Sequence, residues 1–478
     1  MDKDKTYEVV SNIDGEFVDH ALETEERSKK KDAATAKTSW KRFPLWGALV
    51  AAVLLVAVTV TVSLVVANIG GKQQGQQGSQ EPQGGVIQTG KFANLMDGIE
   101  ANPVPNVGSI SSSDAEAVAG FAAKLLKNAR KNGENNLVSP VSVLAALSMT
   151  ANGAKGETLA QMEQTLGMSL SDLNRFFKAY VNSLPQDEKN KLCIADSIWF
   201  RSNTINFNRD FLQANADYYG AAAYEADFSE ETLEKINDWV KTNTDGMIPK
   251  ILDRIQNNDI MYLINALVFE AEWQDIYAET DIFTRDFTLE NGTKKSVELM
   301  CSEENTYIET AKSTGFIKPY ANRKYAFAAL LPNEGVTVSE LIDSLDGKTV
   351  IDALANGKRI TVSAAIPKFE YDFSTDLSET LKAMGMTAAF DGAKADFSGI
   401  GEVMLDGRTR IGRVIHKTFI SVAEKGTKAG AATAVEMSND CVPLITKSVI
   451  LNRPFVYMLI DLENNVPFFI GTFEDVNG

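Results

Sequence analysis

The hydrophobic positions of this chain recur with a helical period in one region and with a strand period in the next. Beyond Ser113, which we expect to cap a helix with Glu116, apolar residues return every three or four positions. A second helical stripe begins after Ser139 and Pro140 and stops near Gly153, a residue type that commonly ends helices. Further helices are predicted up to about residue 184 and over residues 230–241 and 377–384.

Strands are predicted where apolar and β-branched residues alternate or run together without helical spacing. These segments are residues 194–200, 261–269, 325–331, 359–367, 414–422, 448–451 and 455–460. Helices come early and most strands come late, and the chain has neither βαβ alternation nor an internal repeat. This order predicts an α+β domain with largely antiparallel sheets.

The N-terminal segments differ from one another in composition. Residues 1–42 are strongly charged and lack apolar periodicity, which predicts a disordered tail. Residues 43–69 contain an uncharged apolar run of about 23 residues, roughly 35 Å long as a helix, which is enough to span a bilayer. Lysines and Arg42 precede this run, so the positive-inside rule places the N-terminus in the cytoplasm. Residues 70–109, rich in Gln and Gly, predict a flexible linker to an external domain over residues 110–478.

Composition narrows the possible classes of function. The chain has 478 residues, of which 44% are hydrophobic and 23% charged, so it can bury a large core. Its formal net charge of -17 argues against nucleic acid as a partner, because phosphate binding needs clustered Lys and Arg. The three cysteines, Cys193, Cys301 and Cys441, follow no metal-binding spacing and allow at most one disulfide.

Familiar catalytic motifs are missing from the sequence. Its two histidines are His20 and His416, which excludes a two-histidine metal site in the external domain and leaves His416 alone for a triad. The chain contains no GxSxG elbow, phosphate loop, GxGxxG or HExxH motif. A glycosidase with two carboxylates stays open, since there are 64 acidic residues. A large external domain of this kind favours binding or inhibition, without cofactor or metal, over an enzyme.

A run of small residues from Glu424 to Ala434 lies between two predicted strands. Ordinary loops favour Asn, Asp, Pro and Ser, whereas this run contains Ala, Gly and Thr with two lysines. If this run forms a strand, successive side chains point to opposite faces, so Thr427 begins one face and Lys428 the other. The other side chains of the run are small enough for the strand to pass between existing strands. Gly426 at its base has the backbone freedom of a hinge. The run predicts a latent strand, with a flexible linker and an Ala-rich helical turn as alternatives.

Several separated motifs resemble the serpin family and stand in the order that the family has them. Asn136-Leu-Val-Ser-Pro-Val-Ser142 is similar to the start of its second helix, and Asn265-Ala-Leu-Val-Phe269 to a strand of its central sheet. Residues 414–420 lead to Glu424-Lys-Gly-Thr427 as the family's fifth strand leads to its hinge. The other matching motifs are Trp273, residues 381–386 with Phe390, 395–400, 452–455 and 467–471, so the resemblance covers residues 110–475.

The resemblance implies helices packed around three mainly antiparallel β-sheets, with an exposed reactive-centre loop. It also implies irreversible inhibition of serine proteases: the protease cuts the loop, forms an acyl-enzyme, and is trapped when the loop inserts into the central sheet. Insertion requires small residues at the loop base, as inhibitory members have. The matching hinge residues are Glu424, Gly426, Thr427, Ala429, Gly430, Ala431 and Ala432. A non-inhibitory serpin acting as a surface binding module is the alternative.

A polar cluster behind the strands that must part is a further implication of the resemblance. Ser139, Ser142, Asn265 and His416 match the family's sheet-opening region, and Trp273 would lie near the point where insertion begins. A neutral histidine hydrogen-bonded to Ser and Asn would hold the sheet closed without locking it. His416 is therefore expected to serve sheet opening and not catalysis.

The attacked bond follows from counting along the family's loop. Counted from Gly426, the reactive bond is Asp440–Cys441, which would suit granzyme- or caspase-like proteases. The segment up to residue 452 is longer than is usual in animal serpins. Cleavage after Met437, Cys441 or Val442 by elastase- or subtilisin-like proteases therefore stays open.

The expected setting is a monomer held at the outer face of a cell membrane by one N-terminal helix. Few cysteines and a single Asn291-Gly-Thr293 sequon fit a Gram-positive-type bacterial surface. The expected partner is a serine protease, with a cysteine protease as a further option, and not nucleic acid. An unrelated surface hydrolase is the remaining alternative function.

Overall fold

The computed structural model describes residues 92–105, 107–185, 190–256, 259–404, 409–427 and 447–477. The predicted tail, the predicted membrane helix and the predicted loop beyond Thr427 lie outside these ranges. Among the helices that are described, none is both long and apolar enough to cross a membrane. The described ranges contain helices and several sheets, which confirms the predicted α+β class.

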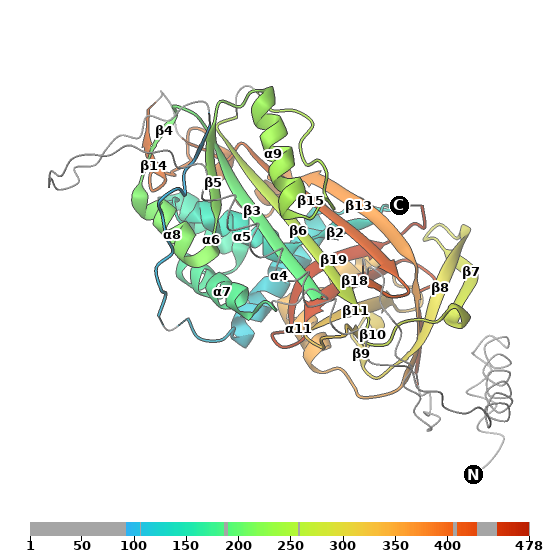
Figure 1. Cartoon of the computed structure of the whole chain (residues 1–478). Coiled ribbons are helices and arrows are strands. Elements are labelled where there is room, and N and C mark those ends of the chain that lie inside the picture. The colour runs from blue at the N-terminus through green and yellow to red at the C-terminus, as the bar shows by residue number, and fades with distance from the viewer. Residues whose placement is uncertain are drawn as a thin grey trace, which may run out of the picture. The chain divides into compact units, whose positions relative to one another are not determined.

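The central sheet has the strand order β1-β5-β3-β6-β16-β15-β13 (Figure 1). β6 pairs with β3 in antiparallel and with β15 in parallel orientation, and the two-residue strand β16 lies between β6 and β15 at one end. The alternating and continuous apolar runs of the sequence thus form a sheet with two covered faces. Its strands are β1 (Phe92–Asn94), β3 (Asn190–Arg201), β5 (Ala222–Ala226), β6 (Met261–Glu272), β13 (Phe369–Asp376), β15 (Arg413–Ala423) and β16 (Gly426–Thr427).

Two further sheets and one small strand pair complete the described β-structure. One sheet has the order β2-β19-β18-β11-β10-β9, the other β17-β12-β8-β7, and β14 pairs with β4. Pairing is mostly antiparallel, as predicted; β3–β5, β6–β15 and β12–β17 are parallel. The strands are β2 (Asn136–Val138), β4 (Ile205–Phe207), β7 (Ile282–Thr288), β8 (Lys294–Glu304), β9 (Tyr307–Glu309), β10 (Ser313–Pro319), β11 (Tyr325–Pro332), β12 (Val362–Pro367), β14 (Gly401–Val403), β17 (Lys447–Ile450), β18 (Phe455–Asp461) and β19 (Val466–Phe473).

The helices cover both faces of the central sheet. α5 is buried at every position, because it packs against β3, β6 and β19 at the inner face. α9 packs on the opposite face, where Ile236 and Val240 join a separate apolar cluster with Trp199 and Ile264. The α-helices are α4 (Ser112–Ala129), α5 (Pro140–Ala151), α6 (Gly156–Leu166), α7 (Leu170–Ser183), α8 (Arg209–Tyr219), α9 (Glu230–Asn243), α10 (Val338–Asp343), α11 (Gly347–Ala355) and α12 (Ser378–Ala383).

The N-terminal cap of α4 differs from the predicted one. Ser111, and not Ser113, has the extended backbone of a cap residue, and its hydroxyl accepts a hydrogen bond from the Asp114 amide at 3.1 Å. The Asp114 carboxylate in turn accepts from the Ser111 amide at 2.8 Å. Both serines have an acidic residue three positions later, so spacing alone could not choose between them. Asp114 gains a second partner in Arg175 at 2.6 Å, which favours the earlier cap.

Ordered structure precedes Ile110, where the sequence places the start of the domain. β1 pairs antiparallel with β5 at the edge of the central sheet. Phe92 stacks on Tyr224 with ring centroids 5.6 Å apart and also contacts Trp199. Residues 92–94, expected in the linker, are therefore a strand of the sheet.

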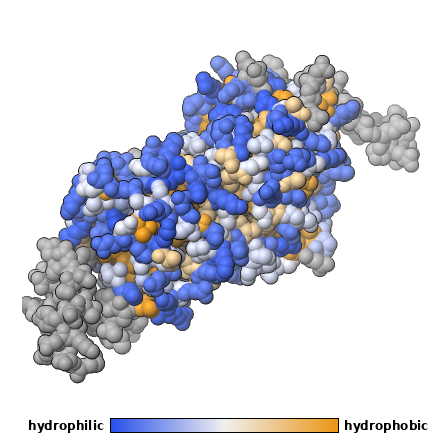
Figure 2. All heavy atoms as spheres, turned by 180° about the vertical axis from the view of Figure 1, so that it is seen from behind, coloured by the Kyte–Doolittle hydropathy of each residue, from blue (hydrophilic) through white to orange (hydrophobic). Residues whose placement is uncertain are grey.

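The surface opposite the view of Figure 1 is largely hydrophilic, and apolar side chains on it are scattered in small spots (Figure 2). The exposed large hydrophobic residues of the described ranges come from different elements. They are Phe92, Val181, Ile276 and Met404.

Candidate functional site

The base of the predicted loop already occupies the central sheet. Gly426 and Thr427 pair with Glu272 and Ala271 of β6 on one side, and with the end of β15 on the other. Thr427 is 2% exposed. The hinge predicted from small residues is thus the first part of a strand between β6 and β15.

Gly426 fits this position because it has no side chain. Its φ of +157° is rare for residues with a Cβ, and a Cβ built there would lie 2.1 Å from the Ala271 carbonyl oxygen. No residue other than glycine can bring its backbone this close to β6 without moving one of the two strands.

β6 and β15 diverge toward the hinge. They pair directly up to Ala266 and Lys417, whereas at Ala271 and Val422 β16 lies between them. With strands about 4.8 Å apart, their separation grows from one spacing to two, about 9.6 Å. This divergence outlines a track that a longer β16 would follow.

Aromatic and charged residues hold the turn that leads into β16; we call Trp273, Tyr277, Tyr320 and Lys368 the entrance clamp. Trp273 donates from its indole nitrogen to the Ala423 carbonyl at 2.8 Å and from its backbone nitrogen to that of Lys425 at 2.9 Å. The Tyr277 backbone nitrogen donates to the Glu424 carbonyl at 3.0 Å. Trp273 therefore lies at the end of β6, beside the turn that leads into β16.

The rest of the entrance clamp fixes side chains of the hinge. Tyr320 stacks on Trp273, with centroids 4.4 Å apart, and its hydroxyl lies 2.5 Å from the Thr427 hydroxyl. Lys368 pairs with the Glu424 carboxylate at 2.8 Å, which lowers the pKa of Glu424. Each hinge residue from Glu424 to Thr427 thus has a hydrogen bond or strand partner.

A buried ion pair lies next to the entrance clamp. Lys318 contacts Glu304 at 2.9 Å, and both side chains are almost inaccessible. The Lys318 ammonium lies 4.4 Å from the Tyr277 ring centroid and 5.5 Å from that of Trp273. Sequence reasoning missed this pair, together with Tyr320 and Lys368, because their partners lie far away along the chain and give no local spacing signal.

The polar residues predicted behind the parting strands come together as one cluster. His416 lies opposite Asn265, and Asn265 lies opposite Asp196, so the three residues form a row across β15, β6 and β3. Ser139 caps α5 with its hydroxyl on the Ser142 amide, and both serines face this row. We call these five residues the gate cluster.

Hydrogen bonds connect the gate cluster across all three strands. The Ser139 amide donates to His416 Nε2 at 3.1 Å, and His416 Nδ1 lies 2.6 Å from Asn265 Oδ1. The Asn265 amide nitrogen donates to Asp196 Oδ1 at 2.7 Å, and the Ser142 hydroxyl donates to the same oxygen at 3.2 Å. Because Nε2 accepts, the neutral His416 carries its proton on Nδ1.

Burial sets the charge state of the gate cluster. It lowers the pKa of His416 to about 3, so the imidazole is neutral at ordinary pH. It raises the pKa of Asp196 well above its usual range, against the two hydrogen bonds that favour the charged form. Sequence reasoning missed Asp196; its polar side chain within an apolar strand was the available signal.

Other chemistry is sparse in the described ranges. They contain no group of three or more His, Cys, Asp or Glu residues that could hold a metal. Cys301 is a free, half-buried thiol, and burial raises its pKa to about 11.

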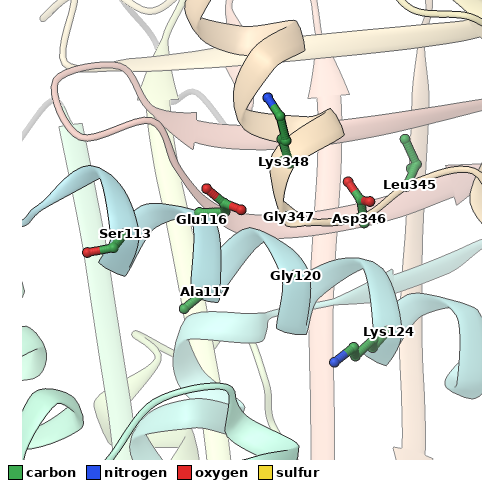
Figure 3. Close-up of a pocket in the computed structure, with 9 residues that line it drawn as sticks. All are labelled: Ser113, Glu116, Ala117, Gly120, Lys124, Leu345, Asp346, Gly347 and Lys348. Atoms are coloured by element: carbon green, nitrogen blue, oxygen red, sulfur yellow. The ribbon is translucent and has the colours of Figure 1, made fainter.

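A pocket of about 560 Å³ lies between α4 and the start of α11 (Figure 3). Glu116, Lys348 and Asp346 surround the point where Gly120 and Gly347 approach each other closely. Its lining residues include no member of the hinge or the gate cluster.

Part of the predicted site lies outside the described residues. This applies to Ala429, Gly430, Ala431 and Ala432 of the hinge, and to the proposed reactive bond Asp440–Cys441. The loop re-enters the described structure at Lys447, in β17 of another sheet.

Comparison with known proteins identifies the class. The family model described as "Serpin (serine protease inhibitor)" matches residues 116–476. Serpin B8 of Homo sapiens is 30% identical over 75% of this chain and 98% of its own. An uncharacterised serpin-like protein of Thermococcus kodakarensis is 29% identical over 81% of this chain and 88% of its own.

Solved structures agree with the sequence relatives. The thermophilic serpin tengpin in its native state is 47% identical, with a TM-score of 0.77, over 80% of this chain and all of its own. Tengpin in its latent state is 46% identical, with a TM-score of 0.69, over 77% of this chain and all of its own. The family model, the sequence relatives and the solved structures thus agree on one class of protein, described as serine protease inhibitors. The chain belongs to the serpin family.

Proposed function

We propose that this chain is a suicide inhibitor of serine proteases, which it traps by inserting its cut reactive loop between β6 and β15. The observation that carries the proposal is the position of β16. Gly426 and Thr427 already pair with both neighbouring strands, so the loop base occupies the start of the track. When the serine of a protease attacks the reactive bond, the C–N bond breaks, the protease becomes acylated by the N-terminal part of the loop, and this freed segment can extend the strand.

The sequence beyond Thr427 is suited to that extension. With a strand period of two, Ala429 and Ala431 would follow Thr427 on the face toward Tyr320, where side chains must be small. Lys428 would lie on the other face. Insertion would carry the acylated protease along the track before the ester is hydrolysed, and distortion of the protease would make the trap irreversible.

The first test is complex formation with a panel of elastase-, subtilisin-, granzyme- and trypsin-like proteases. A band at the combined mass that survives denaturing electrophoresis is the expected result. Clean loop cleavage with full protease activity across the panel would contradict inhibition and leave a binding module.

A hinge variant separates insertion from cleavage. Thr427→Arg places a charge at a position that is 2% exposed, which costs several kcal/mol on insertion. The variant should be cut normally but form at least about tenfold less complex per cut loop, since 1.4 kcal/mol corresponds to a tenfold change in rate. Lys428→Arg is the matched control and should trap protease as the parent chain does. Equal trapping by both variants would refute insertion through the hinge.

We propose Asp440–Cys441 as the bond that the protease attacks. An acidic residue before the cut selects proteases with a basic specificity pocket. The mass of the C-terminal fragment released during complex formation gives its first residue directly. A fragment beginning at Cys441 supports the assignment, and one beginning elsewhere replaces it.

We also propose that residues 43–69 anchor the inhibitor in a cell membrane, with the inhibitory domain outside. The support is the uncharged apolar run and the basic residues before it. Membrane fractions should retain the chain in alkaline carbonate and release it in detergent, and protease added to intact cells should reach the domain. Release by carbonate would contradict an integral anchor.

A further inference from the structure

The carboxyl group of Asp196 is satisfied on one side only. Oδ1 accepts from Ser142 and Asn265, whereas Oδ2 has no contact with solvent and no hydrogen-bond partner within the described structure. A carboxylate here would keep part of its negative charge on an oxygen without a donor, which is costly away from water. A proton on Oδ2 replaces the cost of an unpaired charge with the smaller cost of an unpaired neutral hydroxyl, and it leaves both bonds to Oδ1 in place.

The elements packed against Asp196 bring no compensating charge to it. α5 offers the Ser142 hydroxyl, and α5, β2 and β19 contain no titratable side chain. β6 offers the Asn265 amide, and β15 offers His416, which is neutral.

Charged residues of the neighbouring elements lie elsewhere. On β3 itself, Lys191 and Arg201 stand about 17 Å away along the strand and on its other face, by strand rise and alternation. α9 packs on the other face of the sheet, through the apolar cluster that contains Trp199, Ile236 and Ile264.

Asp196 also holds the next member of the row in place. Asn265 uses its amide nitrogen on Asp196 and its carbonyl on His416, so the orientation of this amide depends on Asp196. His416 belongs to β15 and Asn265 to β6, the two strands that the loop must separate. A change at Asp196 therefore reaches the contact that closes the sheet.

We propose that Asp196 is a proton-controlled positioning residue of the gate cluster: with its proton it holds the sheet closed, and without it β6 and β15 part more readily. The inference rests on the loop insertion proposed above. Opening admits water to Oδ2, so the ionised form favours the open sheet. Because burial raises the pKa of Asp196, closure is firm at acidic pH and weakens as pH rises through that pKa.

The experiment follows insertion of the uncut loop in the full chain between pH 5 and pH 9. After incubation at each pH, samples are returned to one common pH, and the fraction of intact chains whose loop resists limited proteolysis is measured over time. We expect the insertion rate to rise at least about tenfold across this range, as a shift of one pKa unit corresponds to tenfold. Asp196→Asn keeps the shape and the Oδ1 acceptor but cannot ionise, and its rate should vary by less than about twofold.

Asp372→Asn is the matched control, since Asp372 is an exposed residue of β13 outside the gate cluster. It should keep the parent pH profile. An Asp196→Asn variant that also keeps the parent profile, or a parent rate independent of pH, would overturn the proposal. Failure of inhibition itself would show separately, as absence of a protease complex at every pH.

A second measurement does not depend on a folded variant. Infrared difference spectra of the parent chain should contain the carbonyl band of a buried protonated carboxyl at pH 5. The band should disappear over the pH range in which the insertion rate rises. Its absence at pH 5, or its loss in a different pH range, would refute the assignment.

Discussion

Gly426 is the residue on which the inserted loop base depends, because a Cβ would lie 2.1 Å from the Ala271 carbonyl oxygen. Gly426→Ala should expel β16 from the sheet and destabilise the intact chain by about 1–3 kcal/mol, the range for local backbone strain. Denaturant unfolding gives the stability, and active-site titration gives the number of chains cut per protease trapped, which should rise. Gly335→Ala is the control, since Gly335 also has a positive φ but open space around it. If both variants trap protease like the parent, the close approach has no role in insertion.

His416 should make the folded state sensitive to acid. Its pKa is about 3 when folded and near 6.5 when unfolded, so the unfolded chain binds more protons between these values. This contribution to stability is complete above pH 6.5 and falls toward pH 3 by up to about 1.4 kcal/mol per pH unit. Histidine NMR of the chain should show the His416 imidazole neutral at pH 5. A His416 midpoint near 6.5 would contradict the buried hydrogen-bonded geometry.

Asp196 acts on stability in the opposite direction from His416. Burial raises the pKa of Asp196 above the unfolded value of 3.8, so the proton on Asp196 stabilises the folded state. This stabilisation is complete below pH 3.8 and is lost as the pH rises through the pKa that Asp196 has in the folded state. The two groups therefore oppose each other at mildly acidic pH. The family motif around His416 is specific, so the sequence predicted that this residue belongs to the polar cluster. The protonation state of Asp196 depends on its burial by α5 and β6, which no local pattern encodes.

At the scale of single elements, the entrance clamp depends on a charge pair buried between strands. Glu304 on β8 and Lys318 on β10 are both nearly inaccessible, so Glu304→Gln leaves the ammonium without a countercharge beside Tyr277 and Trp273. We expect a loss of about 3 kcal/mol in the free energy of unfolding. The exposed pair Lys358–Glu309 supplies the control, and Glu309→Gln should have little effect. Equal losses in both variants, measured by denaturant unfolding, would refute a special role for the buried pair.

Local sequence rules predict some of the helices and strands and miss others. Apolar patterning identified α9 and β15, each of which buries one face with its own period, and α5, β6 and β11, which are apolar segments buried along nearly their whole length. It placed the α4 cap two residues late, since two serines share the same spacing to an acid and Arg175 decides between them. It also missed β1, whose three residues become a strand only through pairing with β5. Tertiary contacts determine the cap of α4 and the strand β1, and the sequence around each of these elements does not encode those contacts.

For the whole molecule, the two ends of the loop belong to different sheets. β16 begins the loop in the central sheet, and β17 receives it in the sheet with β12, in parallel register. Under the proposed mechanism, a cut between them would free the β16 side to extend along β6 and β15, while β17 would stay paired with β12. The family motifs, spread along the chain, predicted the family and its fold, because they belong to separate elements of that fold.

Thermal unfolding of the chain before and after a single cut in the loop tests this account most directly. An inserted strand adds roughly ten backbone hydrogen bonds at about 1 kcal/mol each, which should raise the unfolding midpoint by at least about 10 °C. The Thr427→Arg chain, cut at the same bond, should show a much smaller rise. A cut parent chain that unfolds at or below the midpoint of the intact chain would contradict loop insertion, and with it the proposed mechanism of inhibition.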